Sequence, residues 1–340
     1  MHGNLSDFAV RSYEDYTVGW ICALPQELAA ATALLDDKHP QLQQPLGDQN
    51  NYTLGNIEGH NVVITCLPSG ICGTTAAATV AERMKRSFSR IRFGLLVGIG
   101  GGVPNGFADI RLGDVVVSNP TGRYGGVIQY DFGKTIEGGR FQRTGVLNKP
   151  PTILLSAVSQ LQARHILGRN QMRAILDEME QKFPDMVNYP GPDQDLLFDS
   201  EYDHVIPGDT CRACDKSHLV RRGQYPEDNP RIFYGLIASG NGMMNHGATR
   251  DKFSRELDVL CFEMEAAGLM DHFPCLVIRG ISDYADSHNL EQWKTYAAAT
   301  AAAYTKELLS VIPKDRMSSR PSSMNTSKVL PFRPPKFTNF

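Results

Sequence analysis

The sequence predicts an α/β sandwich in which helices flank a central sheet. Apolar runs with strand character alternate with helical stretches along most of the 340 residues. The run at 93–97 is continuously apolar, which is typical of a strand buried on both faces of a mixed or parallel sheet. A chain of this length can bury a large core as one big α/β domain or as two smaller ones.

The first part of the chain supplies four predicted strands and two helices. We expect the strands at 18–23, 61–67, 93–97 and 114–118. Pro25 followed by Glu27 indicates the start of the first helix. The second helix is Ala-rich, is capped by Thr74 or Thr75, and runs to about Arg86.

The second part begins with a less periodic segment, about 122–230, which we interpret as an insertion on the core fold. It contains predicted helices at 153–165 and 171–183. Regular structure then resumes with strands at 233–240 and 275–280 and with helices at about 250–257, 266–272 and 290–311. The predicted domain therefore covers 16–312, and the Ser-, Pro- and Lys-rich tail at 313–340 is expected to be disordered.

Composition narrows the classes of partner and the compartment. The net charge is −3, so no basic field favours nucleic acid or an anionic membrane, and a small-molecule substrate suits the balance better. Seven scattered cysteines favour a reducing compartment over a disulfide framework. The first 16 residues contain no apolar signal segment and no stretch is long enough to span a bilayer, so a cytoplasmic or nuclear location is expected.

A glycine run, Gly-Ile-Gly-Gly-Gly at 98–102, follows the third predicted strand. We interpret it as a loop whose backbone amides approach a ligand closely, with a plain tight turn as the alternative. A dinucleotide-binding fingerprint would require a glycine where Val103 stands, and no Gly-Lys-Ser/Thr follows. Dinucleotide and P-loop sites are therefore excluded.

Three acidic residues, Glu27, Glu265 and Asp283, each lie where a strand ends or a helix begins. In open α/β sheets, ligand sites form at the carboxyl ends of the strands. We therefore expect these three side chains to belong to one site.

The chain resembles the nucleoside phosphorylase/nucleosidase superfamily, whose purine branch includes methylthioadenosine/S-adenosylhomocysteine nucleosidases. The motifs that carry the resemblance occur in family order: Ala-Leu-Pro-Gln-Glu-Leu at 23–28, Val-Gly-Ile-Gly-Gly-Gly at 97–102, Ser-Gly-Asn-Gly at 239–242, Phe-Glu-Met-Glu-Ala-Ala at 262–267, and Arg-Gly-Ile-Ser-Asp-Tyr-Ala-Asp at 279–286. The resemblance implies a three-layer sandwich with a twisted mixed central sheet. The long insertion and the segment at 293–299 look like a domain of fungal proteins, often found at the head of larger receptor-like chains.

The resemblance assigns Asp283 to the purine leaving group and Glu265 to the ribose. Asp283 would protonate the base at N7, for which its pKa must rise from about 3.9 by roughly three units, or about 4 kcal/mol. Glu265 would accept hydrogen bonds from the 2′- and 3′-hydroxyls and stabilise the cationic sugar. The alternative for Asp283 is a helix cap.

The other expected substrate contacts surround these two acids. Met264 would pack under the sugar, with a plain core methionine as the alternative. Ile99 and Gly100 would form the floor near the reacting carbon. The resemblance places the base at Ser239, Asn241 and Met243, and Glu263 and Ser282 complete the expected set.

The nucleophile is predicted to be water, with Glu27 as its general base. Phosphorylases of this family hold phosphate with an arginine in a Gly-Asp-Pro-x-Arg segment, which the segment at 23–27 lacks. A carboxylate repels phosphate. The alternatives are a helix-stabilising role for Glu27, and a phosphorylase whose anion site Arg123 or Arg143 rebuilds.

The predicted function is therefore hydrolysis of a purine nucleoside, with adenine as the first choice of base and hypoxanthine or guanine as the second. We expect the protein to need no cofactor and to form a homo-oligomer. The rival functions are a phosphate-dependent phosphorylase and an inactive nucleoside-sensing module.

The insertion carries two further features. Cys211 and Cys214, with His204 and His218 nearby, have zinc-ligand chemistry, but a second Cys pair at standard spacing is absent. Plain packing or a thiol pair is therefore favoured and no metal is predicted. Arg221 and Arg222 form a small basic cluster with Lys216, either a solvated face or contacts for the phosphates of AMP or ATP. Residues 129–131, near the expected pocket mouth, receive no role.

Overall fold

The computed structural model describes residues 11–206, 210–223, 229–288 and 290–314. The described strands are β1 Val18–Cys22, β2 Asp37–Lys38, β3 Tyr52–Ile57, β4 His60–Cys66, β5 Phe93–Gly102, β6 Val115–Ser118, β7 Val127–Gln129, β8 Gly133–Thr135, β9 Phe141–Arg143, β10 Ile232–Ser239, β11 Val259–Glu263 and β12 Cys275–Asp283. The described α-helices are α1 Pro25–Ala33, α2 Thr74–Ser87, α3 Thr152–Ile166, α4 Met172–Lys182, α5 Gly247–Leu257 and α6 Lys294–Val311.

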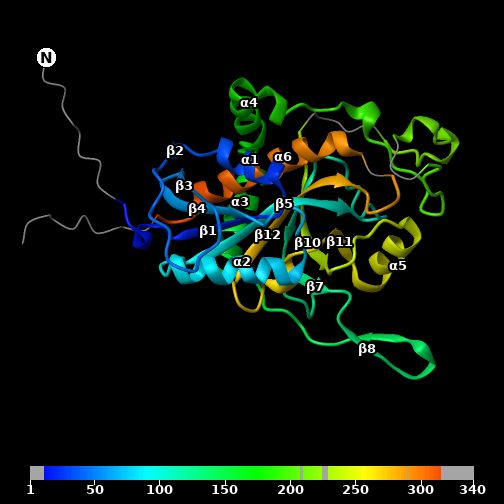
Figure 1. The fold of residues 1–340 in the computed structure, drawn as a ribbon. Coiled ribbons are helices and arrows are strands. Elements are labelled where there is room, and N and C mark those ends of the chain that lie inside the picture. Colours follow the sequence, from blue (N-terminus) through cyan, green and yellow to red (C-terminus); the bar gives the residue numbers. More distant parts are fainter. Residues whose placement is uncertain (1–10, 207–209, 224–228, 289, 315–340) are drawn as a thin grey trace, which may run out of the picture.

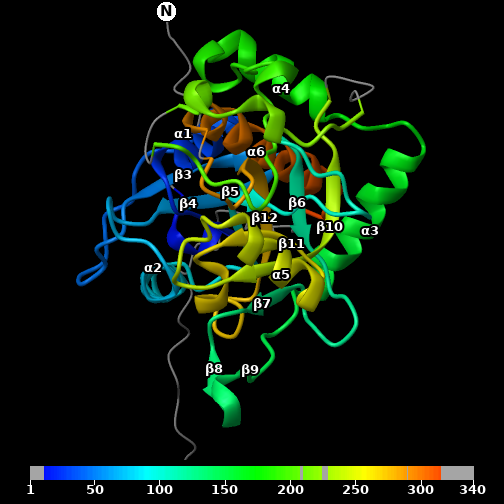
Figure 2. The ribbon, with the colours of Figure 1, turned by 90° about the vertical axis from the view of Figure 1, so that its right-hand side faces the viewer.

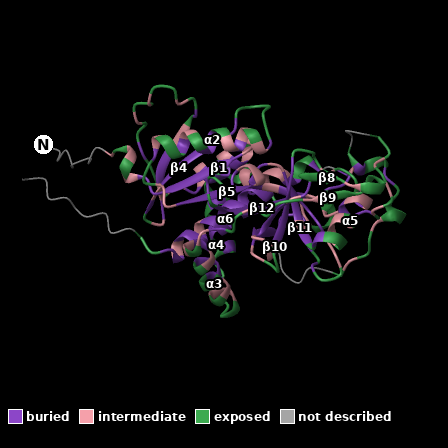
Figure 3. Cartoon of the chain, turned by 90° about the horizontal axis from the view of Figure 1, so that it is seen from below, coloured by how far each residue is buried: buried purple, intermediate pink, exposed green. Residues whose placement is uncertain are grey.

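The central sheet is mixed and runs in the order β11-β10-β6-β12-β5-β1-β4-β3-β2. Helices α1 and α6 cover one face, with α3 and α4 packed outside α6, while α2 lies on the other face (Figure 1). The sheet is buried between these layers and the outer faces of the helices are exposed (Figure 3). The predicted three-layer α/β sandwich with a mixed sheet is confirmed.

Helix α6 is buried along nearly all of its length, because its faces pack against the sheet, α1, α3 and α4. Its run of alanines, 297–303 apart from Thr300, gives it a thin cross-section. A helix that is apolar all round is a core element. Gly280 of β12 marks the closest approach, since a Cβ there would lie 1.8 Å from the carbonyl oxygen of Ala297.

The glycine run at 98–102 is strand and not a loop, contrary to the sequence prediction. Strand β5 pairs with β12 in parallel from Gly94 to Gly101. Its last two glycines also pair antiparallel with Cys261 and Phe262 of β11. Tertiary pairing with two neighbours therefore overrides the low intrinsic strand preference of glycine.

Two predicted helix boundaries also differ. Only a short 3₁₀ turn, Ala266–Gly268, forms within the helix expected at 266–272. Gly268 packs against the backbone of Thr74, where a Cβ would lie 2.0 Å from the carbonyl oxygen. Helix α6 begins at Lys294, after a 3₁₀ turn at Glu291–Trp293, and not at 290.

The segment at 122–230 is built onto the same core. Strand β7 pairs in parallel with β10, and α3 and α4 pack on α6. The hairpin β8–β9 projects away from the body (Figure 2). The predicted domain limits remain a prediction, and residues 315–340 of the predicted tail lie outside the described residues.

All seven cysteines are free thiols. In the ranges that the structure describes, no helix combines the length and apolar composition needed to cross a bilayer.

The contact between β12 and α6 predicts a large effect of one methyl group. Gly280→Ala places its Cβ against the α6 backbone, so we expect the free energy of unfolding to fall by about 2–3 kcal/mol, as for other overpacked cores. Chemical denaturation measures this. Gly106→Ala is the matched control, because no heavy atom lies within 4 Å of its Cβ position. Equal stability of the two variants would contradict the assigned contact.

Candidate functional site

A cavity of about 260 Å³ lies at the carboxyl ends of β5, β11 and β12, beside the first turn of α1. Nine of the residues predicted from the sequence line it: Glu27, Ile99, Gly100, Met243, Glu263, Met264, Glu265, Ser282 and Asp283. Four of these side chains are carboxyls. The cavity is therefore acidic, with apolar walls.

Arg279 of β12 holds the glutamates in place and was not predicted as a site residue. It is 1% exposed, and its Nη2 donates to Glu263 Oε2 at 2.5 Å and reaches Glu265 Oε2 at 3.4 Å. Its Nη1 donates to the carbonyl oxygen of Ile99 at 3.2 Å. Burial opposes the charge of the guanidinium, yet Glu263, Glu265 and Glu27 raise its pKa above the ordinary value. The sequence did contain a signal for Arg279, which is an arginine inside an apolar strand. Because a buried charge needs partners, such an arginine indicates acidic residues nearby.

Glu265 is nearly as buried, and its carboxyl touches the start of α2. Its Oε1 accepts the N–H of Gly73 at 3.2 Å. Burial raises the pKa of Glu265 to about 7, with Glu263 and Glu27 adding to the rise and Arg279 opposing it. This carboxyl therefore changes charge near neutral pH.

Glu27 is fixed by three backbone donors. Its Oε2 accepts the N–H groups of Ala23 and Leu24 at 2.6 and 3.0 Å, and its Oε1 accepts the N–H of Ile99 at 2.8 Å. A carboxylate has about four acceptor positions, so about one position remains for a water molecule. Burial raises the pKa of Glu27, while Arg279 and the three backbone donors oppose the rise.

Asp283 is the last residue of β12. Its Oδ1 accepts the N–H of Ala285 at 2.9 Å, and its Oδ2 accepts the hydroxyl of Ser282 at 2.8 Å. Burial raises the pKa of Asp283 above its ordinary value, and Asp286 adds to the rise while the two hydrogen bonds oppose it. The environment therefore favours the protonated acid more than water does.

The glycines of β5 make room for these acids. A Cβ on Gly98 would lie 2.3 Å from Glu27 Oε1, and a Cβ on Gly101 would lie 2.7 Å from Asp283 Oδ1. Gly98 and Gly101 therefore leave the space into which the carboxyls of Glu27 and Asp283 pack.

Ser239 and Asn241, which were expected to hold the base, do not line the cavity. Ser239 Oγ is buried and accepts the N–H of Ala267 at 2.9 Å. Asn241 Oδ1 accepts the N–H and the hydroxyl of Thr74, both at 3.0 Å. Asn241 therefore supplies the side-chain cap that the sequence analysis assigned to Thr74 or Thr75, and that assignment was wrong, since the N-cap residue is Gly73.

Two residues without an assigned role position the loop that carries Met243. The hydroxyl of Tyr130 donates to the carbonyl oxygen of Gly242, and Asp131 Oδ2 accepts the N–H of Asn241 at 2.7 Å. Both come from the insertion, directly after β7. No sequence signal joins them to a loop 110 residues further along the chain.

Arg221 and Arg222, the predicted phosphate contacts, are not among the residues that line the cavity. Arg222 Nη2 donates to Asp195 Oδ2 at 2.8 Å and to the hydroxyl of Tyr284 at 2.7 Å. Its Nη1 donates to the carbonyl oxygen of Ile110 at 3.2 Å. The guanidinium is thus engaged by the protein itself, while Arg221 is an exposed residue.

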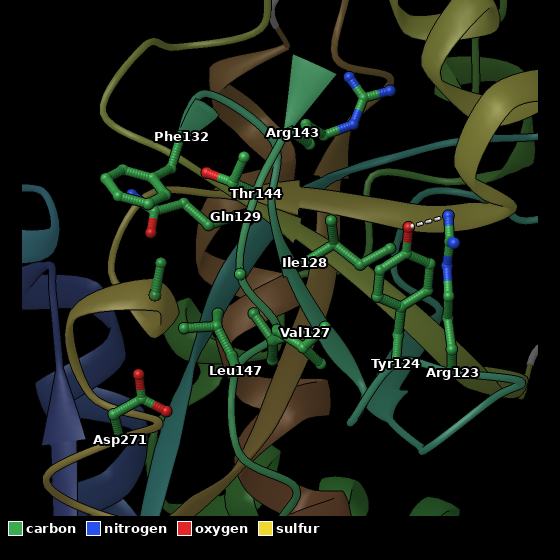
Figure 4. A pocket seen from close by; sticks show the side chains of 13 residues that line it. Arg123, Tyr124, Val127, Ile128, Gln129, Phe132, Arg143, Thr144, Leu147 and Asp271 are labelled. Atoms are coloured by element: carbon green, nitrogen blue, oxygen red, sulfur yellow. Dashed lines mark hydrogen bonds between the residues drawn. The ribbon is translucent and has the colours of Figure 1, made fainter. Parts of the chain in front are cut away.

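Arg123 and Arg143 belong to a different cavity, of about 390 Å³, beside β7 (Figure 4). Arg123 Nη2 donates a hydrogen bond to the hydroxyl oxygen of Tyr124 at 3.0 Å. Arg143 Nη2 forms a salt bridge with Glu256 Oε2 at 2.7 Å. Asp271 is the acidic residue of this lining. The second cavity therefore lacks the facing carboxyls of the first, and neither arginine lines the first cavity.

Comparison with known proteins gives the family. The model of the phosphorylase superfamily matches residues 17–310. A nucleotide-binding leucine-rich repeat (NLR)-like protein of the fungus Hyaloscypha variabilis is 48% identical over 314 residues, which are 91% of this chain and 31% of that protein. The chain thus spans about a third of the length of this relative.

Two bacterial relatives are more distant. A 5′-methylthioadenosine/S-adenosylhomocysteine nucleosidase of Mycobacterium bovis is 26% identical over 87% of this chain and 97% of its own length. The ATP nucleosidase Cap17 of Escherichia coli is 23% identical over 85% of this chain and 50% of its own length.

The fold is shared with solved structures of the same group. A 5′-methylthioadenosine/S-adenosylhomocysteine nucleosidase from S. pneumoniae superposes with a TM-score of 0.55 at 19% identity, covering 87% of this chain and 100% of that one. The resemblance stated from the motifs is confirmed. This chain belongs to the phosphorylase superfamily, which its glycine run and its two acidic motifs had indicated.

Proposed function

We propose that the chain hydrolyses the N-ribosidic bond of an adenine-type purine nucleoside and releases the free base. The observation that carries this proposal is that Asp283, Glu265 and Glu27 line one cavity at the sheet edge. The bacterial relatives named as nucleosidases support hydrolysis as the type of reaction.

Asp283 is the proposed general acid. Cleavage of the bond places negative charge on the departing purine, and a proton at N7 neutralises that charge. The raised pKa of Asp283 keeps a larger fraction of the carboxyl protonated near neutral pH. The hydroxyl of Ser282 orients the carboxyl by its hydrogen bond to Oδ2.

Glu265 is the proposed ligand of the ribose hydroxyls. In its ionised form it accepts from two vicinal donors and places negative charge beneath the sugar as positive charge develops there. Arg279 and the N–H of Gly73 fix its orientation. The thioether of Met264 would pack against the sugar from the same segment.

Glu27 is the proposed base for the attacking water. Its remaining acceptor position and its raised pKa both suit proton uptake. Among the described residues that line the cavity, Arg279 is engaged by glutamates and Lys294 pairs with Glu291 at 2.5 Å. Phosphate would therefore meet carboxylates in place of a free guanidinium, which favours hydrolysis over phosphorolysis.

The walls that remain for the base are apolar and include Met243, Met244 and Phe262. Adenine is the proposed base because the bacterial relatives named above act on adenine nucleosides or ATP by their names. A nucleotide substrate is the second candidate, favoured by the ATP nucleosidase relative but no longer by Arg222.

The rival from another class, an inactive nucleoside sensor, has no need of a proton donor and a water base in one cavity. A homo-oligomer, a cytoplasmic location and the absence of a cofactor remain predictions from the sequence.

The product panel tests the function directly. We expect adenosine-type substrates to yield free adenine and ribose at the same rate with and without inorganic phosphate, as measured by chromatography. AMP and ATP belong in the same panel. Base release that requires phosphate would identify a phosphorylase, and binding without any release would identify the sensor.

The role of Asp283 is tested by Asp283→Asn. We expect kcat to fall about 10²- to 10⁴-fold, because the amide cannot give a proton to the base. Binding of the nucleoside, measured by calorimetry, should change little. Asp185→Asn, which alters an exposed aspartate outside the cavity, is the matched control. Full activity of the Asp283 variant would remove the assigned acid.

The pKa of Glu265 predicts an acid limb in the pH profile. Because its pKa is about 7, the Glu265 carboxyl is ionised above pH 7 and neutral below it. The ionised form is the proposed ligand of the ribose, so kcat/KM should fall as pH falls through about 7. The contribution of Glu265 to the free energy of unfolding depends on pH in the opposite direction. It is fully present below the unfolded pKa of 4.5 and is lost as pH rises through about 7, because the native state holds the proton more tightly. Glu265→Gln should remove the limb, and an unchanged limb in that variant would assign it to another group.

A further inference from the structure

A cluster of metal-ligand side chains lies in the insertion, outside the cavity. His204, Cys211 and Cys214 each offer one ligand atom, and these atoms lie within 4.8 Å of one another. Both cysteines are free and 6% exposed. His218, the other histidine noted in the sequence, stacks on Tyr202 at 4.2 Å and is not in the group.

The histidines around this cluster contain buried nitrogen atoms without hydrogen bonds. His204 Nε2 is buried and makes none. His288, which is 2% exposed, makes none with either ring nitrogen, although Asp286 Oδ1 lies 3.5 Å from Nδ1. The two imidazole rings lie 5.4 Å apart. Buried polar groups without partners are rare and indicate a partner that protein atoms do not supply.

We propose that His204, Cys211 and Cys214 bind one Zn²⁺, with His288 or a water molecule as the fourth ligand. Two thiolates and an imidazole are the donor set that zinc prefers, and structural sites are tetrahedral. At zinc bond lengths of about 2.0–2.3 Å, ligand atoms lie roughly 3.5–3.8 Å apart. The side chains therefore need to move inward by about 1 Å at most.

One hydrogen bond must change when the metal binds. The N–H of Ile206 donates to His204 Nδ1 at 3.2 Å, which places the ring proton on Nε2. Coordination through Nε2 moves this proton to Nδ1, so the Ile206 N–H must turn away. Val205 and Ile206 are 55% and 49% exposed, and water can replace the lost acceptor.

With His288 as the fourth ligand, zinc would join the insertion to the loop after β12. The N–H of His204 already donates to Ser287 Oγ at 2.9 Å, and Phe198 stacks on His288 at 4.1 Å. Ser287 and His288 follow Asp283 by four and five residues. The site is therefore structural, and with His288 as a ligand it cross-links the insertion to this loop. The inference does not depend on the proposed function.

The test is the metal content of the full chain purified under reducing conditions. We expect about one zinc per chain by elemental analysis, or uptake of one equivalent when Zn²⁺ alone is added to the chelator-treated protein. Replacement by Co²⁺ should give the thiolate-to-cobalt charge-transfer band and the intense visible bands of a tetrahedral site.

Variants assign the ligands. Cys211→Ser with Cys214→Ser, and His204→Ala alone, should each lower bound zinc at least tenfold. His218→Ala and Cys66→Ser are the matched controls and should keep it. Replacing His288 by Ala should shift the cobalt spectrum if the histidine is the fourth ligand and leave it unchanged if water is.

Three results would overturn the proposal. Reduced wild-type protein that binds no added Zn²⁺ would do so without any variant having to fold. Zinc retained by the double cysteine variant would identify an adventitious ion only. A Cys211–Cys214 disulfide found by mass spectrometry in protein that takes up no metal after reduction would identify a thiol pair instead.

Discussion

The buried guanidinium of Arg279 is the interaction on which the candidate site depends. It lies inside the sheet edge among Glu263, Glu265 and Glu27. Without it, three carboxyls would be buried together, and each would take up a proton or leave the cavity. Removal of one partner from a buried ion pair costs about 3–5 kcal/mol, because the remaining charge is uncompensated. The cation therefore makes an acidic cavity compatible with a folded core.

The backbone of β5 meets the second requirement, which is space. The carboxyls of Glu27, on α1, and Asp283, on β12, both approach this strand, and the glycines at 98 and 101 leave room for them. Asn241 then caps α2, and Tyr130 and Asp131 hold the loop after β10. The walls of the cavity are thus fixed by contacts between segments far apart in the sequence.

Local signals were sufficient for six strands, for most helices and for the acids at the strand ends. They did not predict β2, β3, β7, β8, β9 and β11, most of which are short or lie in the less periodic segment. Glu27, Glu265 and Asp283 could be grouped because parallel strands that end at one sheet edge bring such residues together. The glycine run was taken for a loop, since its pairing with β11 and β12 is a tertiary property. Arg222 was taken for a free cation for the same reason, because its partner Asp195 lies 27 residues away. The cluster of His204 with Cys211 and Cys214 was set aside because the sequence offers no second Cys pair at standard spacing, whereas the fold brings His204 close to the two cysteines.

The central claim is that Asp283 and Glu265 act on the same nucleoside. A purine C-nucleoside, whose carbon–carbon glycosidic bond resists hydrolysis, allows the complex to be crystallised. We expect Asp283 to lie within hydrogen-bond distance of the purine N7 edge while Glu265 accepts from the 2′- and 3′-hydroxyls of the same molecule. A nucleoside bound in the cavity beside β7, or one that contacts only one of the two carboxyls, would contradict it.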